Sequence, residues 1–130
     1  MKALLINLFL LPGLLLATTG EEISLADISR ALGQGDVNTL TQFLDNEIEL
    51  SILGEDDFYS SSEAAAELKA FFAKYPAAKF AQIHNGVSPT TKAEYCIGNL
   101  DAGNKTFRVV IYLSGTNGSK KIKKLSFDEE

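Results

Sequence analysis

The sequence contains one histidine, His84, and one cysteine, Cys96. His84 stands in the run QIHNG, two residues before Gly86. An imidazole titrates near neutral pH, which makes His84 the candidate general acid or base. The sequence places no carboxylate at a fixed spacing to orient the ring. A structural histidine, hydrogen-bonded near the end of a strand, is therefore the alternative interpretation, and no catalytic set is predicted.

Three further side chains are candidates for binding a ligand together with His84. Tyr59 and Tyr95 can direct phenols into a cavity as hydrogen-bond donors, although amphipathic packing is the alternative for a tyrosine at a strand or loop edge. Arg108 interrupts an apolar strand, so it either binds an anionic ligand or pairs with Glu94 or another surface acid. The predicted ligand-binding residues are Tyr59, His84, Tyr95 and Arg108.

No metal, cofactor or nucleic acid is expected. The acidic run from Glu55 to Asp57 lacks the spaced oxygen ligands of a calcium loop, and solvated loop charge explains it. The single cysteine, Cys96, excludes an intramolecular disulfide and lies in an apolar strand, where it is expected to be a buried small hydrophobe. A formal net charge of -5 disfavours binding to phosphate backbones. Phosphate or acidic-surface binding by the lysines at 120–124 is an alternative to an exposed edge strand that resists aggregation.

The N-terminus has the layout of a cleavable secretory signal. Lys2 precedes an apolar run that ends at Ala17, and small residues follow as far as Gly20. The run contains a Pro-Gly pair and is shorter than the roughly 20 apolar residues of a membrane span. We expect residues 1–20 to be a signal peptide and residues 21–130 to be one mature domain. That domain is expected in the periplasm or outside the cell, with no membrane span after cleavage.

The first half of the mature chain has mostly helical patterns. Ser24, with Asp27 three residues later, predicts a capped helix to Leu32, and Asp36 predicts the cap of a second short helix. Apolar residues alternate in the run EIELSIL, which predicts a half-exposed strand, and a loop is expected at 54–59. One of the serines at 60–62 is expected to cap the main helix, which runs to about Lys74.

Four strands in succession are predicted after the main helix. Their runs are FAQIHNGV, KAEYCIGNL, KTFRVVIYL and KKIKKLSF, separated by turn-rich breaks. The third run is apolar on both faces, which indicates that both faces are covered. Helices can cover one face, and a partner subunit in a homodimer can cover the other. The predicted fold class is α+β, with helices on one face of a curved antiparallel sheet.

Several short motifs in this order resemble the domain-of-unknown-function 4783 family. They are YSSSEAAAELKAFFAKYP, FAQIHNGVS, EYCIGNL, FRVVIYL and IKKLSF, and the resemblance covers roughly residues 23–130. The sequence departs from the family by an alanine where a longer polar residue often follows the helix-capping serine. The positions that match the recurring pattern are Tyr59, Ser60, Phe71, Phe72, His84, Gly86, Ser88, Tyr95, Gly98 and Arg108.

The resemblance implies a nuclear-transport-factor-2-like cone, in which a strongly bent sheet wraps around a long helix, often dimeric through the sheet. It also implies an exported bacterial protein, and it implies no activity. The wider superfamily contains isomerases, dehydratases and many non-catalytic binders, so the fold does not decide the function. Three hypotheses follow: a non-catalytic module that binds a small molecule or a protein, a cavity-type isomerase or dehydratase using His84, and a structural protein that acts through its sheet face.

Overall fold

A computed structural model describes residues 25–114 and 120–130. The expected signal peptide at 1–20 and the expected cap at Ser24 lie outside the described residues. Within those residues, no helix is long and apolar enough to cross a membrane. The elements are α1 (Leu25–Gln34), α2 (Val37–Phe43), β1 (Leu44–Ile52), β2 (Glu55–Ser60), α3 (Ser61–Lys74), β3 (Ala77–Val87), β4 (Glu94–Ala102), β5 (Lys105–Ser114) and β6 (Lys121–Glu129).

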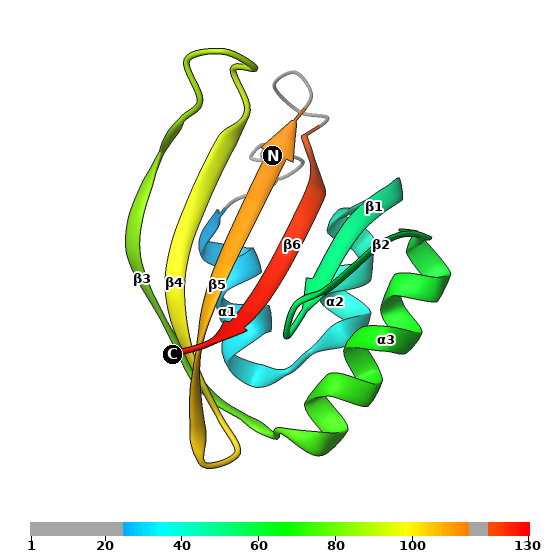
Figure 1. The fold of residues 1–130 in the computed structure, drawn as a ribbon, viewed down its shortest axis with the longest axis vertical. Coiled ribbons are helices and arrows are strands. Elements are labelled where there is room, and N and C mark those ends of the chain that lie inside the picture. Colours follow the sequence, from blue (N-terminus) through cyan, green and yellow to red (C-terminus); the bar gives the residue numbers. More distant parts are fainter. Residues whose placement is uncertain (1–24, 115–119) are drawn as a thin grey trace, which may run out of the picture.

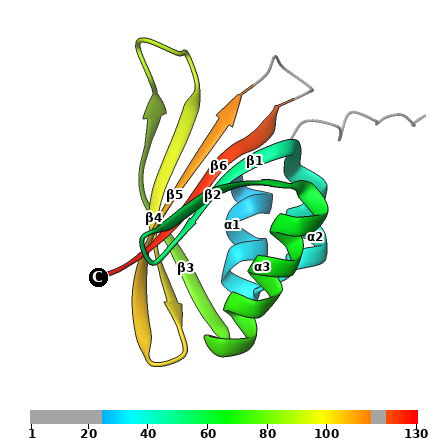
Figure 2. The ribbon, with the colours of Figure 1, turned by 45° about the vertical axis from the view of Figure 1, so that its right-hand side comes forward.

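A strongly bent six-stranded sheet, in the order β2-β1-β6-β5-β4-β3, carries all the helices on one face (Figures 1 and 2). Helix α1 packs on β3 and β4, and α3 packs on β1 and β2. The α+β cone predicted from the sequence is confirmed. The sheet is not wholly antiparallel, because β1 and β6 pair in parallel. We call the side that carries the helices the inner face and the opposite side the outer face.

Strand β2 was expected to be a loop, and that prediction was wrong. Its sequence, EDDFYS, is polar and has little strand propensity, yet it pairs along its whole length with β1. Leu53 (φ 54°) and Gly54 (φ 89°) form the two-residue connection, and positive φ at both positions is the pattern of a type I′ hairpin turn. The turn therefore decides the pairing that the residue types of β2 do not indicate.

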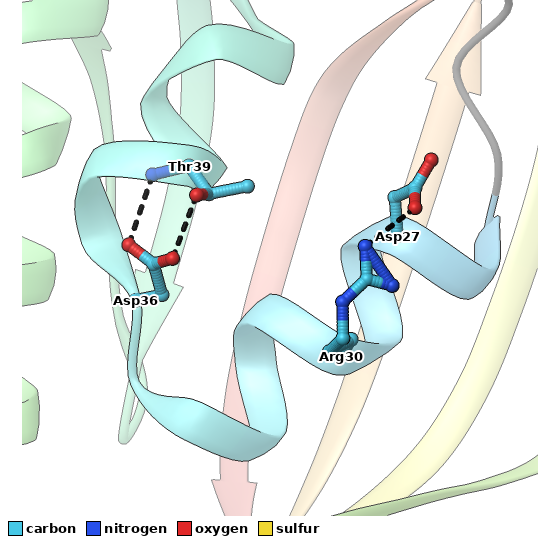
Figure 3. Close-up of polar contacts among 4 residues, drawn as sticks. All are labelled: Asp27, Arg30, Asp36 and Thr39. Carbon is cyan, nitrogen blue, oxygen red and sulfur yellow. Dashed lines mark hydrogen bonds and ion pairs between the residues drawn. The ribbon is translucent and has the colours of Figure 1, made fainter. Parts of the chain in front are cut away.

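The helix caps follow local rules. The Asp36 carboxylate accepts hydrogen bonds from the Thr39 backbone N–H (3.1 Å) and hydroxyl (2.6 Å), which confirms the predicted cap of α2 (Figure 3). Asp27 pairs with Arg30 at 2.7 Å on the first turns of α1 (Figure 3). Ser60 and Glu63 form a complete capping box at the start of α3.

The core lies between the helices and the inner face of the sheet. On β5, Phe107 and every second residue to Leu113 are at most 2% exposed, and they point to the helices. The Phe71 ring of α3 lies 5.1 Å from that of Phe107 and 4.7 Å from that of Phe127, measured between centroids. Leu100 is the register partner of Phe107 across the turn between β4 and β5.

Candidate functional site

A groove of about 340 Å³ lies between α3 and the β1–β2 hairpin. Its walls are apolar and aromatic, and its rim carries charged side chains. The apolar and aromatic lining includes Leu50, Ile52, Leu53, Tyr59, Phe71 and Tyr75, and the charged lining residues are Glu55, Glu67 and Lys74. Tyr59 is thus the one predicted site residue that lies in this groove.

Each wall of the groove is positioned by a regular element. Tyr59 is the register partner of Ile48, a buried residue of β1, so its ring points to the helix side of the sheet. On α3, the i, i+4, i+7 spacing of Glu67, Phe71 and Lys74 places them along one face of the helix. Leu53, in the hairpin turn, forms part of the rim and is 41% exposed.

The groove is negatively charged at its Tyr59 end. Partial burial raises the pKa of the Tyr59 phenol, and the nearby carboxylates, of which Glu67 contributes most, raise it further. The phenol is therefore neutral at physiological pH and available as a hydrogen-bond donor. At the other end, Lys74 Nζ lies over the Tyr75 ring, 5.5 Å from its centroid. Carboxylate and ammonium groups are thus both present at an aromatic surface.

His84 and Tyr95 lie on the opposite, outer face of the sheet. His84 Nε2 is 3.3 Å from the Tyr95 phenol oxygen, and both side chains are accessible to solvent. The Tyr95 ring crosses Gly86, where an added Cβ would lie 2.8 Å from the phenol oxygen. Tyr112 continues the row on β5, with its centroid 6.1 Å from that of Tyr95. These contacts make a cross-strand aromatic row of His84, Tyr95 and Tyr112.

Arg108 also lies on the outer face, as the register partner of Asn99, but it is not held in a pocket. It forms an ion pair with Glu130 at 2.8 Å. The alternative interpretation, that Arg108 pairs with an acid, is the one the geometry favours. The partner is not Glu94, which pairs with Lys120 at 2.9 Å. The predicted set is therefore divided between two faces and does not form one site.

The catalytic hypothesis required His84 to open into a cavity within reach of a phenol. The phenol of Tyr95 is present, but His84 is exposed and lines neither the groove nor the shallower hollow between α2 and α3. Tyr59, the other proposed donor, lies on the inner face. No observation therefore favours His84 as an acid or base in an enclosed site.

The lysine-rich strand β6 is an interior strand of the sheet, and the expectation of an exposed edge was wrong. It lies between β1 and β5. Its lysines and Lys120, just before it, contact acidic side chains of β1 and β4 and a backbone carbonyl near the end of α2. These contacts leave little reason to propose phosphate binding. They are Lys120 with Glu94, Lys123 with Asp45, Lys124 with Glu49, and Lys121 Nζ donating to the Gln42 carbonyl.

Two other candidate groups have structural explanations. Cys96 is fully buried on the inner face, and desolvation raises the pKa of its thiol, which disfavours the reactive thiolate form. The acids at 55–57 lie along β2 at the sheet edge. In the ranges 25–114 and 120–130, no group of three or more His, Cys, Asp or Glu side chains is placed to hold a metal ion.

Sequence reasoning missed most of the groove. Leu53, Glu67, Lys74 and Tyr75 were not singled out, although all line it. The spacing of Glu67, Phe71 and Lys74 places two charged residues on the same helix face as a buried aromatic residue. This pattern could have indicated a polar rim beside an apolar surface. That signal identifies a groove only when β2 is known to lie opposite the helix.

Together, the bent sheet and the helices on its inner face define the nuclear-transport-factor-2-like class of α+β folds. Solved structures show the same fold. An NTF2-like protein from Cytophaga hutchinsonii matches with a TM-score of 0.59 and 15% identity, over 81% of this chain and 91% of that one.

A family model for a domain of unknown function, DUF4783, matches residues 25–128, and the chain belongs to that family. A DUF4783 family protein from Bacteroides ovatus matches with a TM-score of 0.76 and 24% identity, over 85% of this chain and 98% of that chain. One from Bacteroides uniformis has a TM-score of 0.74 and 21% identity, over 81% and 95%. The comparison with curated proteins found no match. The resemblance inferred from the sequence motifs is confirmed.

Proposed function

We propose that this chain is an exported, non-catalytic module that binds a small ligand in the groove between α3 and the β1–β2 hairpin. The observation that carries the proposal is the groove itself. Its volume of about 340 Å³ is in the range of small-molecule sites, and its aromatic walls end in a few charged groups. Such walls bury the apolar part of a ligand, while the charged groups orient it.

The backbone of Leu53 supports a functional role for this groove. A leucine at φ 54° is in the left-handed region, which favours Gly or Asn over other residues. Either would relieve the strain in this turn, yet the position carries an apolar side chain at the rim of the groove. Strained backbone positions cluster at active sites and ligand-binding sites, so the conformation of Leu53 supports a site here.

Native mass spectrometry of the protein, gently purified from the periplasm of a bacterial host, tests the binding proposal. We expect a co-purified small molecule that is lost in Ala70→Trp, because Ala70 lines the groove and an indole there fills it. Ala66→Trp is the matched control, since Ala66 is exposed on the same helix and does not line the groove. A ligand retained by Ala70→Trp, or the absence of any ligand together with failure of small molecules to bind, would contradict the proposal.

The outer face favours a second element of the proposal, a homodimer formed through the sheet. Four apolar or aromatic residues of β4 and β5 alternate with the inward-pointing residues and lie on the outer face: Tyr95, Ile97, Val110 and Tyr112. They are only half-buried, since the helices lie on the other face (Figure 2). A second copy of this chain would remove this apolar surface from water.

Analytical ultracentrifugation tests the dimer. We expect the wild-type protein to sediment as a dimer and Val110→Lys to sediment as a monomer, because a lysine would place an unpaired charge in the interface. Val87→Lys is the matched control, since Val87 is 55% exposed near the end of β3 and lies on the inner face. A monomeric wild-type protein at micromolar concentration would rule out this part of the proposal.

Export is tested by the mass of the recovered protein. The apolar run and the small residues up to Gly20 support cleavage close to that position. We expect the periplasmic protein to lack about the first 20 residues. A protein that keeps its full mass and stays in the cytoplasm would contradict it.

A further inference from the structure

We infer that the groove selects a ligand with an ammonium group attached to a small apolar body. The inference rests on the proposed binding function and adds the chemical class of the ligand. It depends on three properties of the groove: carboxylates that form no ion pair within residues 25–114 and 120–130, accessible aromatic rings, and a limited volume.

Two carboxylates of the groove form no ion pair with any of the residues that the structure describes. Glu55 begins β2 and Glu67 lies on the facing surface of α3, and both line the groove. In the part of the chain that the structure describes, neither takes part in an ion pair. A neutral or anionic ligand would displace water from these carboxylates without bringing a positive charge to them. Loss of hydration without a compensating charge is unfavourable. An ammonium group replaces the lost water with charge-assisted hydrogen bonds.

The aromatic walls are suited to the same charge. The rings of Tyr59 and Tyr75 line the groove, and aromatic faces attract cations through their quadrupole. The protein already uses one of these faces in this way, because Lys74 Nζ lies 5.5 Å from the centroid of the Tyr75 ring. Tyr59, in contrast, is surrounded by carboxylates. Its pKa is raised by burial and by Glu67, Asp57, Glu55 and Glu63, so the potential at this end of the groove is negative.

Volume limits the apolar body of the ligand. A groove of about 340 Å³ is at the lower end of small-molecule sites. It holds a single ring or a short aliphatic chain. Lys74 at the opposite end disfavours a second ammonium group there, so the geometry points to a monovalent cation with its charge near Tyr59 and its body toward Tyr75.

The test uses three probes of similar size and different charge: 2-phenylethylamine, 2-phenylethanol and 3-phenylpropanoate. Their binding to the purified protein is measured by calorimetry or NMR titration at low salt. We expect the amine to bind about tenfold more tightly than the alcohol, which is the size of one charge-assisted hydrogen bond. The carboxylate is expected to bind more weakly than either, and added salt is expected to reduce the preference for the amine.

Charge variants identify the groups responsible. Glu67→Gln is expected to weaken amine binding about tenfold and to leave alcohol binding unchanged. Glu47→Gln is the matched control, because Glu47 is an exposed glutamate of β1 that does not line the groove. Lys74→Met is expected to act in the opposite direction and strengthen amine binding. Tyr59→Phe keeps the ring and is expected to bind the amine, whereas Tyr59→Leu is expected to lose most of the affinity.

The outcomes separate this inference from the proposed function. Equal binding of the three probes, or a preference for the carboxylate, with loss in Ala70→Trp, would overturn the ammonium inference and leave the groove as a binding site. An unchanged amine affinity in Glu67→Gln, with circular dichroism showing a folded variant, would also overturn it. If no probe binds and no ligand co-purifies, both the inference and the proposed function fail.

Discussion

Gly98, at the centre of β4, leaves room for an aromatic ring on the inner face of the sheet. An added Cβ at this position would lie 2.3 Å from Cζ of Phe80 and 2.7 Å from the carbonyl oxygen of Ala81. Both distances are far shorter than van der Waals contact. The Phe80 ring can shift, but the Ala81 oxygen belongs to the backbone of the neighbouring strand β3. Gly98→Ala therefore forces β3 and β4 apart.

The expected loss of stability follows from these two contacts. Forcing an extra methyl group into a well-packed interior destabilises by about 1–3 kcal/mol. Replacing a glycine by alanine also restricts the unfolded chain, which stabilises by about 0.4–1 kcal/mol. The midpoints of the two ranges, about 2 and about 0.7 kcal/mol, leave Gly98→Ala less stable than the wild type by about 1 kcal/mol. For a domain of this size, that corresponds to a fall in the melting temperature of roughly 4 °C or more.

Urea unfolding monitored by circular dichroism measures this difference in unfolding free energy. All variants are compared at the same protein concentration, because the stability of a dimer depends on concentration. Gly86→Ala is the matched control. The three atoms nearest to its Cβ all belong to the side chain of Tyr95, with the phenol oxygen at 2.8 Å, and that side chain can swing toward solvent. We expect its unfolding free energy to stay within about 0.5 kcal/mol of the wild type. Equal stabilities of Gly98→Ala and Gly86→Ala would refute the reasoning.

A second variant tests the cause directly. Phe80→Leu removes the ring that meets the new methyl group but leaves the Ala81 oxygen in place. We expect Phe80→Leu to recover part of the stability lost in Gly98→Ala, with a coupling of about 0.5 kcal/mol or more between the two positions. Additive effects would show that the ring is not responsible.

Three further predictions concern groups outside the groove. The pKa of Asp36 is lowered by its hydrogen bonds to Thr39, so its contribution to stability is present above its ordinary pKa of 3.8 and is lost as the pH falls through the lower folded value. Urea unfolding between neutral and acid pH should therefore show a shallower acid decline for Asp36→Asn than for the wild type, and identical pH profiles would contradict this. Ser60→Ala should destabilise α3 by about 1 kcal/mol through loss of its capping box, whereas Ser61→Ala, measured in the same way, should not; equal losses would argue against the cap. The Cys96 thiol, buried and with a raised pKa, should react with a thiol reagent only after urea unfolding, and rapid labelling of the folded protein would show that the site opens.

Local patterns predicted most elements of the fold. Asp36 and Ser60 are caps because a short oxygen-bearing side chain satisfies free N–H groups at a helix start, whatever the rest of the chain does. The alternation along β5 put Phe107 to Leu113 on one face, but the strand is apolar on both faces, and only the structure shows that this face is the inner one. Strand β2 was not predicted because its polar residues have no strand preference. Its pairing depends on the turn at Leu53 and on the edge of β1.

The candidate site was less predictable than the fold. Four residues were proposed as one ligand set, but Tyr59 lies on the inner face, and His84, Tyr95 and Arg108 lie on the outer face. The face of a strand residue depends on register, and the bulge between Gln82 and His84 changes the parity along β3. A prediction that ignores the bulge and assigns alternate residues of β3 to alternate faces places His84 on the inner face, which is wrong.

The sequence by itself determined the class of fold, the caps of α2 and α3 and the family, because these depend on residue types and short spacings. The tertiary structure decided which segments lie opposite each other. It placed β6 inside the sheet and in parallel with β1, where its lysines meet Asp45 and Glu49. It also brought the hairpin turn over α3 and so formed the groove. Residues on three separate elements meet there only because the chain folds back, and that proximity has no local signature in sequence.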